Sequence, residues 1–209
     1  MGTIRQQESL IVQIQKGLPV GPFAWSQNAK SPRAPAGFCA DPALIALGQA
    51  LAARVADATR LTAEAAAAAG LLELASGRFA QPIHDVHNLA TRVIARFLTT
   101  GQGTTETERN FIGRVGVMAA VFGVSIATLT RSYVLWRDTN LRVLNEEVKR
   151  LGTALAVSDV AQRIIRSSAD TGIARMVQAY EDHMKVITRR YVGTPVAAHT
   201  IQQMLVAVR

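Results

Sequence analysis

The sequence predicts an all-α fold. Apolar residues make up 49% of its 209 residues but aromatic residues only 5%, and alanine is abundant. This composition favours closely packed helices over a β-sandwich, which needs bulky and β-branched strands. Apolar residues also recur every three or four positions along several segments, which is the spacing of one helix face. A chain of this length can bury a substantial core.

Helix start and stop signals divide the chain into three parts. We expect an irregular N-terminal extension over residues 1–40, a helical domain over residues 41–193 and a short C-terminal helix over residues 194–209. Prolines and glycines prevent regular structure in much of the extension. Phe23 and Trp25 are unusual in such a polar stretch, so they are candidates for docking to the domain or to a partner.

The first half of the helical domain contains two helical regions. An aspartate and a proline at positions 41–42 are an N-cap and a first-turn proline. They open an alanine- and leucine-rich run to about residue 75, which we expect to break near Thr59 or Gly70. A further helix is expected from the proline at position 82 to about residue 98.

The second half of the domain has stronger boundary signals. Thr105 and Glu108 have the spacing of a capping box and predict a helix that ends near Gly123. Ser125 can cap a long helix that continues to about residue 151, where a glycine follows. Ser158 is expected to open the last long helix, and a softer stretch at residues 167–172 predicts a kink in it.

Two apolar seams run along these last helices, one within residues 126–151 and one within residues 173–187. Each seam is longer than one helix pair needs, so we expect part of this surface to form a subunit interface. Tyr133, Trp136 and Asn140 share a face of the first seam, where they indicate either a pocket wall or subunit contact or a set of core aromatics. The candidates for a ligand pocket or interface are Phe111, Met118, Phe122, Leu129, Tyr133, Trp136, Asn140 and Tyr180.

Composition also limits where the protein acts. The single cysteine, Cys39, excludes an internal disulfide framework and suits a reducing cytoplasm. The longest uncharged run, residues 115–130, is shorter than the ~20 residues of a membrane span, so we expect a cytoplasmic protein without membrane contact. The net charge of +8 is spread along the chain. It permits binding to nucleic acid or a large acidic complex, but no known nucleic-acid-binding motif is present.

Few residues have the spacing that catalysis or metal binding requires. The chain has no phosphate-binding loop and no serine in a nucleophile elbow, so we expect it not to be an enzyme. His84 and His87 lie on neighbouring turns of one helix face and, with His183, are candidates for binding a metal or haem. The alternative for His84 and His87 is a pair of surface histidines in a first helical turn. We expect no cofactor, with haem as the alternative.

The stretch from Phe111 to Val148 resembles the central helices of the RsbRD-type N-terminal domain. That group shows a pattern of the form G…A..GVSL..L.RAY, followed by a helix rich in Trp, Leu and Glu. The resemblance covers roughly residues 45–190. The matching residues are Gly113, Gly116, Ala120, Gly123, Val124, Ser125, Leu129, Arg131, Tyr133 and Trp136.

The resemblance implies a globin-like bundle of about six helices without haem, usually a homodimer, that serves as the sensory front end of bacterial stress-signalling proteins and transcription regulators. The 40-residue extension departs from the pattern, and no output domain follows in these 209 residues. We therefore expect a non-catalytic sensory and interaction module, either part of a larger regulator or an adaptor that docks on a signalling partner. The alternatives are a basic adaptor that binds nucleic acid or an acidic complex, and a globin-like protein that binds haem or a small ligand.

Overall fold

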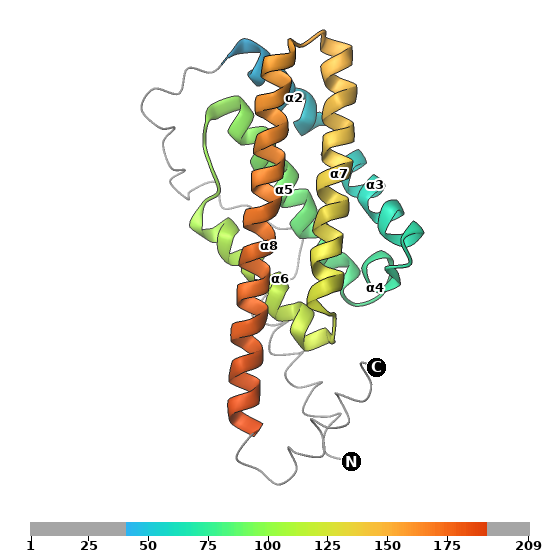
Figure 1. Cartoon of the computed structure of the whole chain (residues 1–209), viewed down its shortest axis with the longest axis vertical. Helices are drawn as coiled ribbons and strands as arrows, with labels where there is room; N and C mark the ends of the chain where they lie inside the picture. Colours follow the sequence, from blue (N-terminus) through green and yellow to red (C-terminus); the bar gives the residue numbers. More distant parts are fainter. Residues whose placement is uncertain (1–40, 192–209) are drawn as a thin grey trace. The chain divides into compact units, whose positions relative to one another are not determined.

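The computed structural model describes residues 41–191, and all regular structure in this range is helical (Figure 1). The predicted all-α class is therefore confirmed. The expectations for residues 1–40, including Phe23 and Trp25, and for residues 194–209 lie outside the described residues. The helices are α2 (Pro42–Ala53), α3 (Val55–Ala68), α4 (Leu72–Ala75), α5 (Ala80–Thr100), α6 (Glu106–Phe122), α7 (Ile126–Leu151) and α8 (Leu155–Tyr191).

Helix α5 occupies the centre of this arrangement. It contacts each of the other described helices, and one face of it is apolar and buried along its whole length. Helices α7 and α8 run side by side and are joined by a short turn, and α3 lies alongside α7 (Figure 1). Helix α2 packs against both α5 and α7. Within the described range, no helix combines the length and the apolar character that crossing a membrane requires.

The helix boundaries that depend on local capping agree with the sequence. The hydroxyl of Thr105 accepts a hydrogen bond from the backbone of Glu108, and the Glu108 side chain accepts one in return, which completes the capping box. The hydroxyl of Ser125 accepts a bond from Thr128 N at 3.0 Å and begins α7. Gly123 and Gly152 end α6 and α7 in the left-handed conformation, with φ of 73° and 63°, where glycine avoids the steric cost of a Cβ.

Two boundaries differ from the prediction. The first helical run does break near Gly70, as expected, because α3 ends at Ala68 and Gly70 adopts a φ of 75°. It does not break near Thr59, which lies inside α3, but breaks at Arg54, where no glycine or proline stands. Helix α8 begins at Leu155, so Ser158 is not its N-cap but a buried residue of its first turn, 3% exposed. A serine near a helix start looks like a cap in the sequence, but packing against the neighbouring helices decided its place. Residues 167–172 are helical and do not interrupt α8.

An ion pair fixes the turn between α5 and α6. Arg96 donates from both terminal nitrogens to the two carboxylate oxygens of Glu108, each at 2.7 Å, and also to the carbonyl of Gly103 at 2.9 Å. Burial of Glu108 raises the pKa of its carboxyl, but the hydrogen bonds from Arg96 and Thr105 outweigh burial and leave the pKa below its usual value. The capping box thus carries a charge pair that also holds the α5–α6 connection.

Candidate functional site: a buried polar cluster between α5, α7 and α8

Five side chains form a polar cluster in the middle of the bundle. His87 and Thr91 come from consecutive turns of α5, and Tyr133, Trp136 and Asn140 from consecutive turns of α7. Each is at most 2% exposed. The three- and four-residue spacing places each set on one helix face, so the packing of α5 on α7 brings them together. We call these five residues the core cluster.

Hydrogen bonds join the two helices through Thr91. The indole nitrogen of Trp136 lies 3.0 Å from the Thr91 hydroxyl and 3.1 Å from the backbone carbonyl of His87. The same hydroxyl lies 3.0 Å from that carbonyl and 3.1 Å from the Asn140 side-chain oxygen, and it can donate its one proton to either. The Asn140 amide nitrogen donates to the Trp136 carbonyl at 2.8 Å. In this part of the core cluster, the polar side chains of Thr91, Trp136 and Asn140 therefore have hydrogen-bond partners.

The other part of the core cluster contains polar atoms without partners. The two ring nitrogens of His87 and the hydroxyl of Tyr133 make no hydrogen bond within the described residues. The His87 ring packs edge-on against Tyr133, with centroids 5.4 Å apart, and nearly parallel to Trp136, with centroids 6.3 Å apart. Such buried, unpaired groups cost free energy.

Burial sets the protonation states of these two groups. It lowers the pKa of His87 to about 3, with a smaller contribution from the neighbouring His84, and it raises the pKa of Tyr133. At neutral pH the imidazole is therefore uncharged and the phenol protonated. The core cluster presents no charged nucleophile or base to the solvent.

Helix α8 reaches the core cluster at a glycine. A Cβ at Gly172 would lie 2.5 Å from Cε1 and 3.1 Å from the hydroxyl oxygen of Tyr133. Close packing continues at Gly116 of α6, where a Cβ would collide with the backbone carbonyl of Met176. These two glycines let α8 lie directly against the Tyr133 ring and the α6 backbone.

The residues expected to form a pocket or interface lie in three separate places. Leu129, Tyr133, Trp136 and Asn140 are at most 1% exposed within one chain. The expectation that their seam is left partly open for a second subunit is therefore wrong, because α5 and α8 already cover it. The other members belong to different helices, α6 (Phe111, Met118, Phe122) and α8 (Tyr180). Phe122 packs edge-on against Phe79 with ring centroids 6.3 Å apart.

The three histidines do not converge. His87 is buried, which contradicts the alternative of a surface pair, whereas His84 is only partly covered. His183 lies on α8, away from both in the sequence and on the partly covered end of the helix. Among residues 41–191, no group of three or more histidine, cysteine, aspartate or glutamate side chains is placed to hold a metal ion. Haem ligation by His87 would require α5 and α7 to separate, since Tyr133 and Trp136 pack against the ring.

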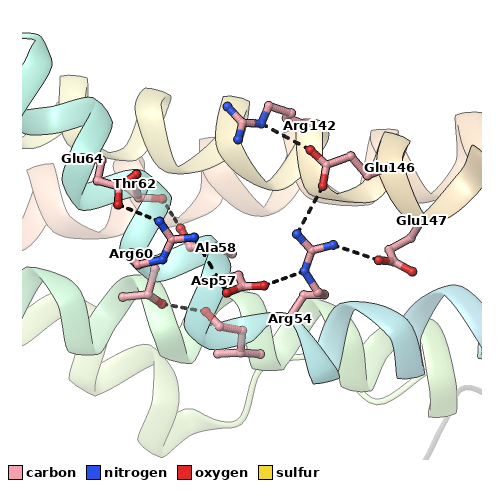
Figure 2. Close-up of polar contacts among 11 residues, drawn as sticks. Arg54, Asp57, Ala58, Arg60, Thr62, Glu64, Arg142, Glu146 and Glu147 are labelled. Carbon is pink, nitrogen blue, oxygen red and sulfur yellow. Dashed lines mark hydrogen bonds and ion pairs between the residues drawn. The ribbon is translucent and has the colours of Figure 1, made fainter. Parts of the chain in front are cut away.

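A second polar group lies around the partly exposed Arg54 and includes the buried carboxylate of Glu147 (Figure 2). At the break between α2 and α3, Arg54 donates to Asp57 at 2.8 Å, Glu146 at 3.2 Å and Glu147 at 2.9 Å. The hydrogen bonds to Asp57 and Glu147 raise the pKa of Arg54. Figure 2 shows the guanidinium extending from the helix break toward the carboxylates of α7. These ion pairs tie the α2–α3 corner to the C-terminal half of α7.

Sequence reasoning did not single out Arg54 or Thr91. The partners of Arg54 on α7, Glu146 and Glu147, are more than 90 residues away, so no local pattern reveals them. Thr91 does lie one turn after His87, and its position on the buried face of α5 was the available signal. Comparisons with protein-family models, with curated proteins and with solved structures found no match.

Proposed function

We propose that this protein is a non-catalytic sensory and interaction module in which the packing of α7 and α8 responds to a signal. The observation that carries the proposal is the core cluster, which joins three helices and contains polar groups on His87 and Tyr133 that have no partner among residues 41–191. A ligand or partner that favours a second packing, in which these groups find partners, would shift the population toward it. No bond needs to be made or broken for such a response.

Helix α8 supplies the path from the core cluster to the surface. It is a single helix of 37 residues, and its fully buried positions end at Met176, well before its end at Tyr191. A shift at Gly172 is therefore transmitted along a rigid element to an exposed segment. This arrangement supports the role implied by the RsbRD-type resemblance, a sensory front end in bacterial stress or regulatory signalling that passes its state to an output domain or a docked protein.

The test of this coupling is a pair of substitutions read out by hydrogen exchange. Gly172→Ala should raise amide exchange over residues 177–189, because the added methyl group pushes α8 away from Tyr133. Tyr133→Leu should reduce that effect in the double variant, because it removes the ring that the methyl group meets. Gly103→Ala, where a Cβ would meet nothing within 4 Å, is the matched control. Exchange that changes only within one turn of residue 172, or equally in both backgrounds, would count against the proposal.

We also propose that the module is a homodimer that pairs through the outward face of α7. A shallow groove of about 510 Å³ runs along this face, lined by Asp138, Leu141, Arg142, Asn145, Glu146 and Lys149. The charges follow one another as acid, base, acid, base. An antiparallel pairing with a second copy would place Asp138 opposite Lys149 and Arg142 opposite Glu146, which is the self-complementary pattern that a two-fold interface needs.

Charge exchange tests this dimer. Asp138→Lys alone should weaken self-association about tenfold or more, because it places lysines opposite each other. Asp138→Lys combined with Lys149→Asp should restore association, because the opposite charges are then exchanged. Light scattering coupled to size exclusion measures both, and high salt should weaken the dimer. A monomer at all concentrations, or a double variant no better than the single one, would contradict the assignment to this face.

A further inference from the structure

The terminal part of α8 carries a second apolar stripe that the bundle leaves partly open. The buried positions of α8, such as Ala169, Gly172 and Met176, face α6 and α7. Val177, Tyr180, Met184 and Ile187 follow on an adjacent face with alternating spacings of three and four residues, the spacing of a helix that packs along another helix. Met184 is 37% exposed, and the other three are partly exposed.

The sequence that follows α8 repeats this pattern in reverse. Gly193 is a helix-stop residue two positions after the end of α8, and Thr194-Pro195 has the form of an N-cap and a first-turn proline. Beyond them, Ala198, Ile201, Leu205 and Val208 are spaced by three, four and three residues. The positions of the α8 stripe have the spacings three, four and three between Val177 and Ile187. Each set spans about 15 Å along a helix.

The two patterns also agree in register. Counted outward from the bond between residues 192 and 193, Met184 and Ile201 are equally far along the chain, as are Tyr180 and Leu205, and Val177 and Val208. An antiparallel pair of helices joined by a short turn brings such positions to the same height.

We propose that residues 194–208 form a helix that folds back on α8 and covers the stripe of Val177, Tyr180, Met184 and Ile187. The occupant is a segment of the same chain and not a second copy, because a short turn gives the segment an effective concentration of about millimolar at the stripe. It is also uncharged between Pro195 and Val208 apart from His199, which suits an apolar surface. This inference does not depend on the proposed function.

Disulfide trapping in the full chain tests the proposal. The background is Cys39→Ser, which removes the single native thiol. Met184→Cys with Ile201→Cys places thiols at the predicted contact, and Asp182→Cys with Ile201→Cys is the control, because residue 182 is exposed and lies about 200° around the helix from residue 184. Under mild oxidation the first pair should close within one chain at least ten times faster than the control pair, independently of protein concentration.

Mixing isotopically light and heavy chains before oxidation separates the two possible occupants. Disulfides found only within light or within heavy chains support the proposal. Mixed disulfides between light and heavy chains would assign the stripe to a second copy and overturn it, and equal rates for the two pairs would show that the segment does not dock.

A second measurement does not require a crosslink. In the Cys39→Ser background, alkylation of the thiol of Met184→Cys should accelerate at least fivefold when Ile201→Asp is added, because the charged residue releases the segment. Gln202→Asp, whose position lies off the apolar face, should leave the rate unchanged. Equal rates with and without Ile201→Asp would overturn the proposal.

Discussion

Replacing His87 by leucine should make the protein more resistant to acid. The folded state holds the imidazole uncharged, with its pKa lowered to about 3 mainly by burial, whereas in the unfolded chain the ring titrates near its ordinary value of about 6.5. Protons therefore bind preferentially to the unfolded chain. The stability that depends on the neutral ring is complete above about pH 6.5, and it decreases as the pH falls toward the folded pKa.

The magnitude follows from the two pKa values. Between about pH 7 and about pH 4.5, proton binding to His87 in the unfolded chain lowers the free energy of unfolding by about 2.5 kcal/mol. A leucine side chain does not bind a proton, so the free energy of unfolding of the variant should not decrease by this amount at low pH. At neutral pH the free energy of unfolding of the variant should lie within about 1.5 kcal/mol of that of the unchanged protein. The variant loses ring contacts, but this loss is offset because two buried nitrogens without partners among the described residues are also removed.

Urea denaturation followed by circular dichroism at several pH values measures the difference between the two proteins. The carboxylates titrate in both, so only the difference between the two curves reports on His87. His84→Gln is the control: repulsion from His84 is the smaller of the two causes of the shift, so most of the pH dependence should remain. Parallel curves for His87→Leu and the unchanged protein, or a His87 ring that titrates near pH 6.5 by NMR, would refute the reasoning.

Two further substitutions test the contacts that hold α6 against its neighbouring helices. Glu108→Ala should lower the free energy of unfolding by about 3–5 kcal/mol, because it leaves the partly buried Arg96 without its bidentate partner. Glu106→Ala, at an exposed position of the same turn, should change the free energy of unfolding by less than about 0.5 kcal/mol. Equal losses for the two variants in denaturant titrations would contradict the role assigned to the Arg96–Glu108 pair. Gly116→Ala should lower the free energy of unfolding by about 1–3 kcal/mol, because the added methyl group overpacks against the α8 backbone. A thermal midpoint of unfolding no lower than that of Gly103→Ala would contradict the close approach of α6 and α8.

Local signals explain how much of the fold was predictable. The capping box at Thr105, the cap at Ser125 and the glycines after α6 and α7 act within one helical turn, so the sequence shows them directly. The break at Arg54 was missed because no residue there disfavours a helix by itself. Its guanidinium binds carboxylates of α7, and only the packed structure brings these groups together.

The candidate site was predictable in part for the same reason. Helical spacing placed Tyr133, Trp136 and Asn140 on one face, but spacing does not say whether that face meets a second subunit or the chain's own α5. The histidines illustrate the limit. Two imidazoles one turn apart suggested either a metal site or a pair of surface histidines. Neither interpretation included the burial of His87 against the aromatic rings of α7.

The sequence by itself determined the helical class, the positions of the strongest caps and the apolar face of each long helix, because these depend on residues within a few positions of one another. Only the tertiary structure decided which helix faces pack against one another. It placed Gly172 against Tyr133 and left both ring nitrogens of His87 buried without a hydrogen-bond partner among the described residues. The physical reason is that burial and desolvation depend on groups far apart along the chain, so the properties that make the core cluster a candidate site arise only when α5, α7 and α8 pack together.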